Sequence, residues 1–143
     1  MQIERRMSTD RDAARAFAYL SDFETTTEWD PGTVRTVRES GDGGVGTRYR
    51  NTSRFLGRTT EVIYTVVELD PAGRIALRGE NASLVARDTI TVRPAAAGGS
   101  TVDYRAEFAF RGWVRLLRPV LALALERLGD RAARGMEEAL AGR

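Results

Sequence analysis

The amino-acid sequence predicts an α+β domain in which a seven-stranded, curved antiparallel sheet packs around a long C-terminal helix. Three observations carry this prediction. Apolar residues recur every three or four positions over residues 113–140, which is the period of an α-helix. Seven β-type stretches lie before that helix, most of them joined by turns of hairpin length. The last of these stretches alternates apolar and polar side chains, so one face of the sheet is expected to be buried against the helix.

The N-terminal part of the chain predicts one strand followed by two short helices. Residues 2–7 alternate apolar and polar side chains, as a half-exposed strand does. The polar run at 8–10 offers N-cap oxygens to a helix over 13–20. The Ser-Asp pair at 21–22 can end that helix and cap a second one. A Trp-Asp-Pro-Gly turn at 29–32 then leads into the sheet.

The middle of the chain predicts six further strands, separated by turns rich in Gly, Pro and Asn. In order, they are expected at residues 33–39, 45–55, 59–69, 74–80, 84–93 and 101–110. The glycines at 41, 43 and 46 match the spacing of a dinucleotide-binding loop. That motif requires a helix to follow, whereas the residues that follow here are β-type, so we interpret the segment as a hairpin loop.

The C-terminal helix carries one continuous apolar stripe, which is expected to form the core with the sheet. Its predicted members are Leu117, Leu121, Ala124, Leu128, Ala132, Met136 and Leu140. Pro119 predicts either a helix start near Leu117 or a kink. Leu116, Leu123 and Leu125 lie off the stripe and could meet a second subunit, a membrane surface or the two short helices.

The composition excludes several classes of chemistry. The chain has 143 residues, expected to form a single domain over 1–143, and it contains no Cys and no His. All 22 basic residues are Arg, which removes thiolate, imidazole and Schiff-base chemistry and most zinc sites. We therefore expect no metal and no cofactor. The formal charge of +2 argues against nucleic acid as a partner.

The sequence also predicts a location for the protein. The first ten residues are polar and charged where a signal peptide would be apolar. The longest apolar run, 120–125, is far shorter than the roughly 20 residues of a transmembrane helix. We expect a cytoplasmic protein without a transmembrane segment.

Two short segments, residues 19–23 and 28–32, read Tyr-Leu-Ser-Asp-Phe and Glu-Trp-Asp-Pro-Gly. They resemble helix-grip proteins of the START-like (SRPBCC) superfamily, in its polyketide cyclase/dehydrase and lipid-transport branch. The order of elements over the whole chain resembles that superfamily as well. The resemblance implies a hydrophobic pocket between the sheet and the C-terminal helix. It does not imply one activity, because the superfamily includes carriers, cyclases, hydrolases and partner-binding modules.

Asp88 is the most informative single residue, because it falls on the apolar face of its predicted strand together with Ile90 and Val92. A buried carboxylate either finds a partner or has its pKa raised, and a raised pKa suits a general acid or base. Three interpretations stay open: an ion pair with an arginine such as Arg5, a position at a wet strand end, and a catalytic role.

The candidate ligand-binding residues are those expected on the inner face of the sheet, on the helix stripe or at the pocket entrance. Tyrosine and asparagine side chains there could orient a ligand, while aromatic and aliphatic ones pack against it. The set is Tyr49, Asn51, Tyr64, Asp88, Tyr104, Phe108, Trp113, Leu117 and Leu121. The resemblance places Trp113 at the entrance. For each tyrosine, plain core packing is the alternative.

Three functions are compatible with this sequence. The first is binding of a small hydrophobic molecule, such as a lipid, polyketide or isoprenoid, for storage, transport or sensing. The second is a polyketide cyclase/dehydrase-type enzyme, in which acid and base work falls to Asp88, the tyrosines, Arg5 or an ordered water. The third is a protein-interaction module, such as a homodimer, that uses the leucines outside the stripe.

Overall fold

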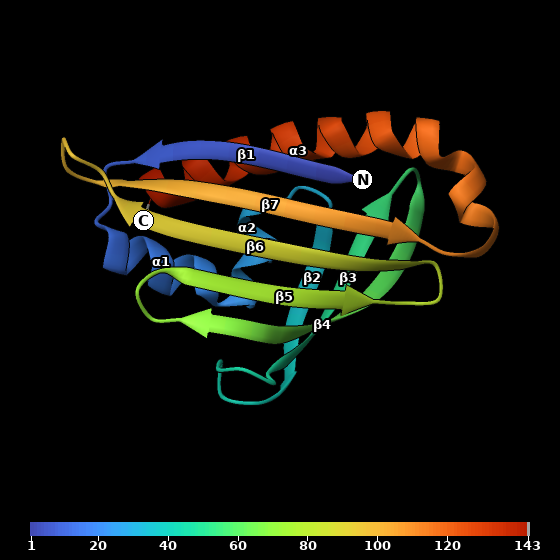
Figure 1. Ribbon diagram of the computed structural model, residues 1–143, viewed down its shortest axis with the longest axis horizontal. Coiled ribbons are helices and arrows are strands. Elements are labelled where there is room, and N and C mark those ends of the chain that lie inside the picture. Colours follow the sequence, from blue (N-terminus) through green and yellow to red (C-terminus); the bar gives the residue numbers. More distant parts are fainter. Residues whose placement is uncertain (143) are drawn as a thin grey trace.

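The computed structural model describes residues 1–142 and contains the predicted seven-stranded antiparallel sheet, with the strand order β1-β7-β6-β5-β4-β3-β2 (Figure 1). The last residue of the predicted domain, Arg143, lies outside the described part of the chain. Strands that follow one another from β2 to β7 are neighbours, as in a meander. β1 joins at the β7 edge, with Ile3 opposite Ala106.

The boundaries of the elements follow the predictions closely. The strands are β1 (Gln2–Thr9), β2 (Thr33–Ser40), β3 (Arg48–Phe55), β4 (Arg58–Asp70), β5 (Arg74–Glu80), β6 (Leu84–Pro94) and β7 (Ser100–Phe110). The helices are α1 (Ala13–Ser21), η1 (Phe23–Thr25), α2 (Thr26–Trp29), η2 (Gly112–Leu117) and α3 (Arg118–Ala141), of which η1 and η2 are 3₁₀ helices. The glycine-rich segment before β3 is a hairpin loop, as expected.

The start of α1 differs from the prediction. Its N-cap is Asp12, whose side chain accepts the N–H of Arg15 at 2.8 Å. The polar run at 8–10 does not cap the helix, because Ser8 and Thr9 extend β1 and pair with β7. Asp22 does cap the next helix, η1, by accepting the N–H of Glu24 at 3.1 Å.

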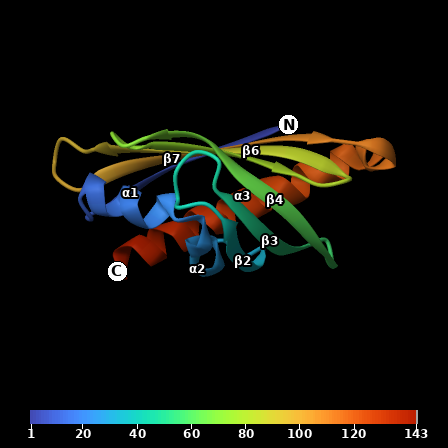
Figure 2. The same cartoon turned by 90° about the horizontal axis from the view of Figure 1, so that it is seen from below.

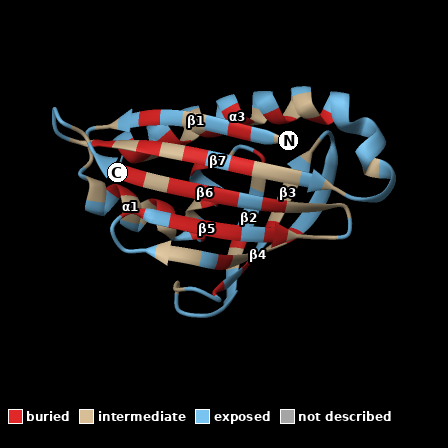
Figure 3. Ribbon diagram, viewed as in Figure 1, coloured by how far each residue is buried: buried red, intermediate tan, exposed pale blue. Residues whose placement is uncertain are grey.

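The sheet curls around α3 (Figure 2). In that view, β5, β6 and β7 form one layer, and β2 and β3 turn down beside the helix. The burial pattern in Figure 3 alternates along most of β7, so this strand has one buried and one wetter face. In β6 the inner positions are buried, and Thr89 on the other face is buried as well. The predicted inner positions of the central strands are buried, among them Ile75, Leu77 and Ile90.

The buried stripe of α3 is shifted from the predicted one. Leu125 belongs to the core and is 4% exposed, so its placement off the stripe was wrong. Leu117 is 40% exposed, because it ends η2 before the helix reaches the core. α3 begins at Arg118, with Pro119 in its first turn, where a missing N–H leaves no hydrogen bond unmade. Its buried members are Leu121, Leu125, Gly129, Ala132, Met136 and Leu140.

The two glycines inside α3 let the helix approach its neighbours closely. A Cβ at Gly129 would lie 2.6 Å from Cγ2 of Ile3 on β1. A Cβ at Gly135 would lie 2.0 Å from the carbonyl oxygen of Trp29, at the end of α2. Alanine is the better helix former, so glycine at these positions lowers the stability of the helix but allows the close contacts. They hold the C-terminal half of α3 against β1 and α2.

Candidate ligand cavity

A cavity of about 500 Å³ lies between the concave face of the sheet, α3 and η2. Its volume falls within the range of pockets that hold small organic molecules. Most of the wall is aliphatic or aromatic. The apolar lining residues are Phe23, Trp29, Phe55, Leu56, Val62, Leu84, Phe108, Phe110, Trp113, Val114, Leu117, Leu121, Leu125 and Leu128. The curved sheet and the straight helix therefore enclose an apolar space that their own side chains do not fill.

The exposed members of the lining mark the mouth of the cavity. Leu56 and Arg58 belong to the β3–β4 hairpin, and Trp113 and Leu117 belong to η2. Leu56 has a φ of 53°, a left-handed conformation that is unfavourable for a branched side chain. The hairpin thus holds an apolar side chain at the mouth at a conformational cost.

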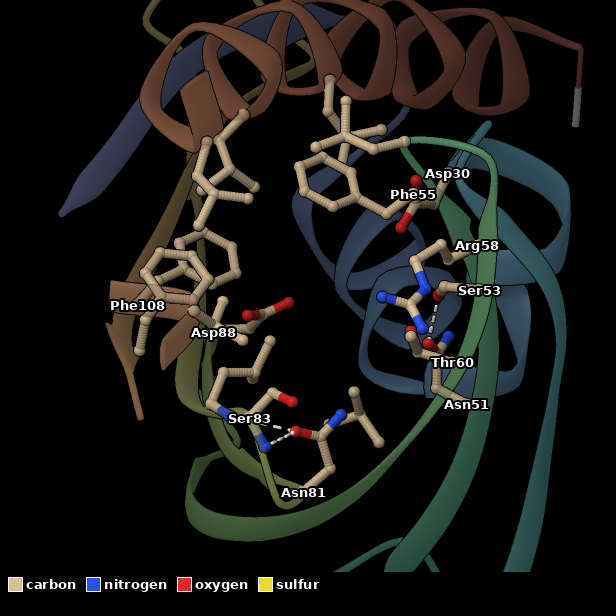
Figure 4. Close-up of a pocket in the computed structure, with 18 of the residues that line it drawn as sticks. Asp30, Asn51, Ser53, Phe55, Arg58, Thr60, Asn81, Ser83, Asp88 and Phe108 are labelled. Atoms are coloured by element: carbon tan, nitrogen blue, oxygen red, sulfur yellow. Dashed lines mark hydrogen bonds between the residues drawn. The ribbon is translucent and has the colours of Figure 1, made fainter. Parts of the chain in front are cut away.

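Asp88 projects into the cavity from β6 (Figure 4). It is 5% exposed. Its Oδ2 accepts a hydrogen bond from the hydroxyl of Tyr104 at 3.2 Å, and its Oδ1 has no partner within the described part of the chain. The pKa of Asp88 is raised from 3.8 to about 7, mainly by burial and secondly by the negative charge of Asp30, against the lowering effect of the Tyr104 hydrogen bond.

Arg5 is not the partner of Asp88, and the ion pair considered for it was wrong. The guanidinium of Arg5 binds Glu126 at 2.8 Å and Asp130 at 2.9 Å, both on α3. Arg5 shares a β1 face with Ile3 and Met7, but β1 lies at the edge of the sheet. Its side chain therefore reaches over the adjoining helix, away from the cavity. The other interpretation, that Asp88 lies at a solvent-exposed strand end, is excluded too, because Asp88 is buried.

Asp30 is a second carboxylate at the cavity, and sequence reasoning missed it. It follows α2, and Figure 4 shows its carboxylate on the wall opposite Asp88. Its Oδ1 accepts the N–H of Gly32 at 2.9 Å, and its Oδ2 accepts the Thr33 hydroxyl at 3.1 Å. Burial raises the pKa of Asp30 despite these hydrogen bonds. The sequence predicts a turn at the Trp-Asp-Pro-Gly segment, and this turn orients the carboxylate of Asp30 toward the cavity.

Two tyrosines stand beside the carboxylates. Tyr64 on β4 and Tyr104 on β7 line the cavity, and burial, reinforced by the negative charge of Asp88, raises the pKa of both phenols. They therefore stay protonated near neutral pH and can donate hydrogen bonds. Tyr49 is not in the cavity wall. It is buried and packs edge-on against Phe23, with 5.8 Å between ring centroids, which is the core role held open for each tyrosine.

Asn51 lines the cavity, but protein groups already satisfy its amide. Its Nδ2 donates to the hydroxyls of Thr33 and Thr36 at 3.1 and 2.9 Å. Its Oδ1 accepts a hydrogen bond from Ser53, the next residue on the same face of β3. Asn51 therefore fixes Ser53 and the strand ends around it.

The arginines of β3 lie on the solvent side of the sheet, whereas Arg58 of β4 lies on the cavity side. Arg48, Arg50 and Arg54 point to solvent, as their alternation with Tyr49 and Asn51 predicts. Arg58 begins β4 at the hairpin, and Figure 4 shows its guanidinium beside Ser53 on the cavity side. Sequence reasoning did not single it out, because the faces of a strand are ambiguous at a turn.

The remaining predicted residues also meet at the cavity. Phe108 lies on the same wall as Asp88 (Figure 4). Trp113, 63% exposed, covers part of the mouth. Leu117 and Leu121 complete the lining on the helical side. Contact of these residues with a ligand stays a prediction. Within residues 1–142, no group of three acidic side chains lies close enough together to hold a metal ion.

A curved sheet that encloses an apolar cavity with a C-terminal helix defines a helix-grip fold. The chain belongs to the family described as polyketide cyclase/dehydrase and lipid transport, whose sequence model matches residues 1–141. The predicted membership of the START-like superfamily is confirmed. No curated protein sequence matches the chain. Among residues 1–142, no helix is long and apolar enough to cross a membrane.

Three solved structures illustrate the likeness. The Zhui aromatase/cyclase from Streptomyces sp. R1128 has a TM-score of 0.84 at 15% identity, covering 98% of this chain and 93% of its own. TTHA0849 from Thermus thermophilus has 0.83 at 14% identity, with coverages of 98% and 97%. A START superfamily protein from Mycobacterium smegmatis has 0.73 at 12% identity, with coverages of 96% and 98%. At these identities, the likeness establishes the fold.

Proposed function

We propose that this protein binds a small hydrophobic molecule, such as a lipid, a polyketide or an isoprenoid, for storage, transport or sensing. The observation that carries the proposal is the cavity of about 500 Å³ with a mainly apolar wall. An empty apolar space of this size costs stability, because the side chains around it lack partners. A ligand of matching size would supply those contacts.

The polar groups of the cavity narrow the class of ligand. Oδ1 of Asp88 is buried without a hydrogen-bond partner among residues 1–142, and a buried acceptor left unpaired is costly. A ligand hydroxyl or phenol that donates to this oxygen would remove the cost. Arg58 at the mouth could donate to a carbonyl or carboxylate at the other end. The ligand would then have an apolar body and a hydrogen-bond donor at its inner end.

A pair of valines on β4 tests the proposal. Val62 is 6% exposed and lines the cavity, whereas Val67 is 39% exposed and does not. The purified protein would be screened by thermal shift and native mass spectrometry against fatty acids, isoprenoid alcohols and aromatic polyketides. A ligand at about 100 times its Kd adds about 2.7 kcal/mol to the free energy of unfolding, which raises Tm by several degrees.

We expect Val62→Phe to lose the ligand-induced shift, because the ring occupies cavity space. Val67→Phe, the same substitution five residues away, should keep it. Circular dichroism would verify that both variants fold. Equal ligand binding by Val62→Phe and Val67→Phe would contradict a site in this cavity. A panel that produces no shift and no bound mass would argue against hydrophobic ligand binding itself.

The second candidate is an enzyme of the cyclase/dehydrase type, and the geometry of Asp88 favours it. Dehydration of a polyketide needs a base that removes a proton beside a carbonyl and an acid that protonates the departing hydroxyl. With a pKa of about 7, Asp88 would be present in both protonation states near neutrality. Tyr64 could hold the carbonyl by a hydrogen bond, whereas the hydroxyl of Tyr104 already donates to Asp88 and would position that carboxyl group. Arg5 takes no part in this scheme, because it is bound to α3.

One comparison distinguishes an enzyme from a simple binding protein. Asp88→Asn keeps the shape of the side chain but cannot accept a proton. If the protein is an enzyme, the variant should still bind a polyketide and should fail to convert it, as followed by product mass spectrometry. Conversion at the wild-type rate would rule out Asp88 as the base.

A further inference from the structure

Exposed apolar side chains concentrate around the mouth of the cavity. On η2 and the first turns of α3, Trp113, Leu116, Val120 and Leu123 are 63%, 82%, 59% and 58% exposed. Leu56, at the tip of the facing hairpin, is 56% exposed and also lines the cavity. We call these five residues the mouth patch. Single exposed leucines are ordinary, but a cluster of large apolar groups marks a site of interaction.

The helical spacing separates three members of the mouth patch, Leu116, Val120 and Leu123, from the cavity lining, whereas Trp113 and Leu56 belong to both. In η2, with three residues per turn, Val114 and Leu117 face the cavity. Leu116 and Val120 continue along the outer side as η2 passes into α3. Leu121 lines the cavity beside them. The outer apolar stripe is therefore additional to the one that the fold and the cavity use.

The mouth patch is bordered by positive charge. Three arginines, Arg111, Arg115 and Arg118, lie in this stretch, and no Asp or Glu occurs between Glu107 and Glu126. Arg111 binds Glu80. Arg115 and Arg118 are exposed and form no ion pair with any residue in 1–142. Arg58 adds a further positive charge at the hairpin. A surface of this type combines apolar side chains with unpaired cations.

We propose that the mouth patch docks the protein onto an anionic phospholipid membrane, so that a hydrophobic ligand passes between the bilayer and the cavity without crossing water. Trp and Leu side chains bury in the interfacial region of a bilayer, and neighbouring arginines are attracted to anionic headgroups. The mouth of the cavity would then open toward the lipid. The surface goes beyond the proposed ligand site, because none of its outer apolar residues on α3 lines the cavity.

A second copy of this chain fits the mouth patch less well. In a twofold dimer the same surface meets itself, so the positively charged stretch with Arg115 and Arg118 would meet a second copy of that stretch, which contains no carboxylate. An anionic lipid surface supplies the missing negative charge. A protein partner would need acidic groups arranged around an apolar centre.

Vesicle flotation of the full chain tests the docking surface. The probes are vesicles of phosphatidylcholine with about 30% phosphatidylglycerol, on the order of the anionic content that binds basic segments, and vesicles of phosphatidylcholine only. We expect binding to the anionic vesicles to be at least about tenfold stronger than binding to the neutral ones. Raising the salt concentration from about 0.1 M to about 0.5 M should weaken it several-fold, because the screening length falls to roughly half. Equal binding to both, or none, would overturn the proposal.

Two substitutions of the same kind locate the surface. Leu116→Glu places a negative charge in the mouth patch, whereas Val45→Glu places one in the β2–β3 loop, where Val45 is 66% exposed. We expect Leu116→Glu to weaken binding to the anionic vesicles about tenfold or more, as like-charge repulsion and lost burial require. Val45→Glu should bind within about twofold of the wild type.

The remaining outcomes are equally decisive. If Leu116→Glu binds the vesicles as tightly as the wild type, the mouth patch is not the docking surface. If size-exclusion chromatography shows a dimer that Leu116→Glu dissolves, the patch covers a second copy and the membrane proposal fails. Uptake of a water-soluble ligand probe by Leu116→Glu should equal that of the wild type, so the failure of docking and the failure of ligand binding are distinguishable.

Discussion

Replacing Asp88 by asparagine should stabilise the folded protein at alkaline pH and leave its stability nearly unchanged near pH 4. The reason is the pKa of Asp88, which burial and the negative charge of Asp30 together raise from 3.8 to about 7 in the folded protein. In the unfolded chain the carboxyl is in water and ionises near its ordinary pKa. The folded protein therefore holds on to a proton that the unfolded chain releases.

The sign follows from proton linkage. Below about pH 4 Asp88 is protonated in both states, so it favours neither. Between about pH 4 and 7 the unfolded chain binds fewer protons, so the free energy of unfolding falls as the pH rises. Above about pH 7 both states are ionised and the loss is complete. The pKa of Asp88 differs by about three units between the folded and unfolded states, which corresponds to a loss of about 4 kcal/mol in the free energy of unfolding. Asparagine does not titrate, so this loss is absent from the variant.

Thermal unfolding of both proteins at pH 5 and pH 8 measures the effect. The Tm advantage of Asp88→Asn should grow by several degrees between the two values, because 1 kcal/mol corresponds to about 2–4 °C or somewhat more in a chain of this length. Asp10→Asn, at an exposed position, is the control and should follow the wild type. An advantage that is constant with pH would show that Asp88 is not the titrating group.

Replacing Gly135 by alanine should destabilise the protein by roughly 3 kcal/mol, although alanine favours helices by about 1 kcal/mol over glycine. The added Cβ would lie 2.0 Å from the carbonyl oxygen of Trp29. The clash involves backbone, which a side-chain rotation cannot relieve. Either α3 or the end of α2 must move. Because Asp30 follows α2, the same shift would displace that carboxylate from the cavity wall.

Chemical denaturation of Gly135→Ala would measure the change. Arg134→Ala, at an exposed position next to it on α3, should change the free energy of unfolding by less than about 0.5 kcal/mol. If Gly135→Ala is instead more stable than the wild type, helix propensity outweighs the contact, and α3 does not press on α2 as the structure has it.

The unpaired oxygen of Asp88 links the stability of this protein to its proposed function. A valine or leucine at position 88 would pack on the apolar face without the cost of a buried carboxylate. A residue that lowers the stability of the fold at its own position, as Asp88 does, is typical of a functional site. Asp30 on the opposite wall raises the cost, since its negative charge raises the pKa of Asp88. A ligand that donates a hydrogen bond to Asp88 would reduce that cost.

Much of the candidate site could be predicted from the sequence, because strand alternation assigns each side chain to a face. Asp88, Tyr104 and Phe108 were predicted on the inner face, and the structure places all three in the cavity wall. Tyr64 was predicted on that face as well, and it too lines the cavity. Tyr49 is on the correct face, but it lies outside the wall because Phe23 covers its ring.

Other features depend on how distant segments meet. The partner of Arg5 is on α3, more than a hundred residues away in sequence. Asp30 reaches the cavity because its turn packs beneath α3, and Arg58 reaches it because the sheet curls. These three relations have no periodic signal within one segment. Leu125, in contrast, lies at helical spacing from the buried Leu121 and Gly129, so its burial follows a stripe that the prediction did not choose.

The sequence by itself determined the order of the elements, the inner face of each central strand and the amphipathic helix, since these follow from side-chain periods of two and 3.6 residues. The tertiary structure decided which inward side chains face empty space, which carboxylates share it and which leucines stay in water. These depend on the curvature of the sheet and the path of α3 across it, and both arise from packing between segments far apart in the chain.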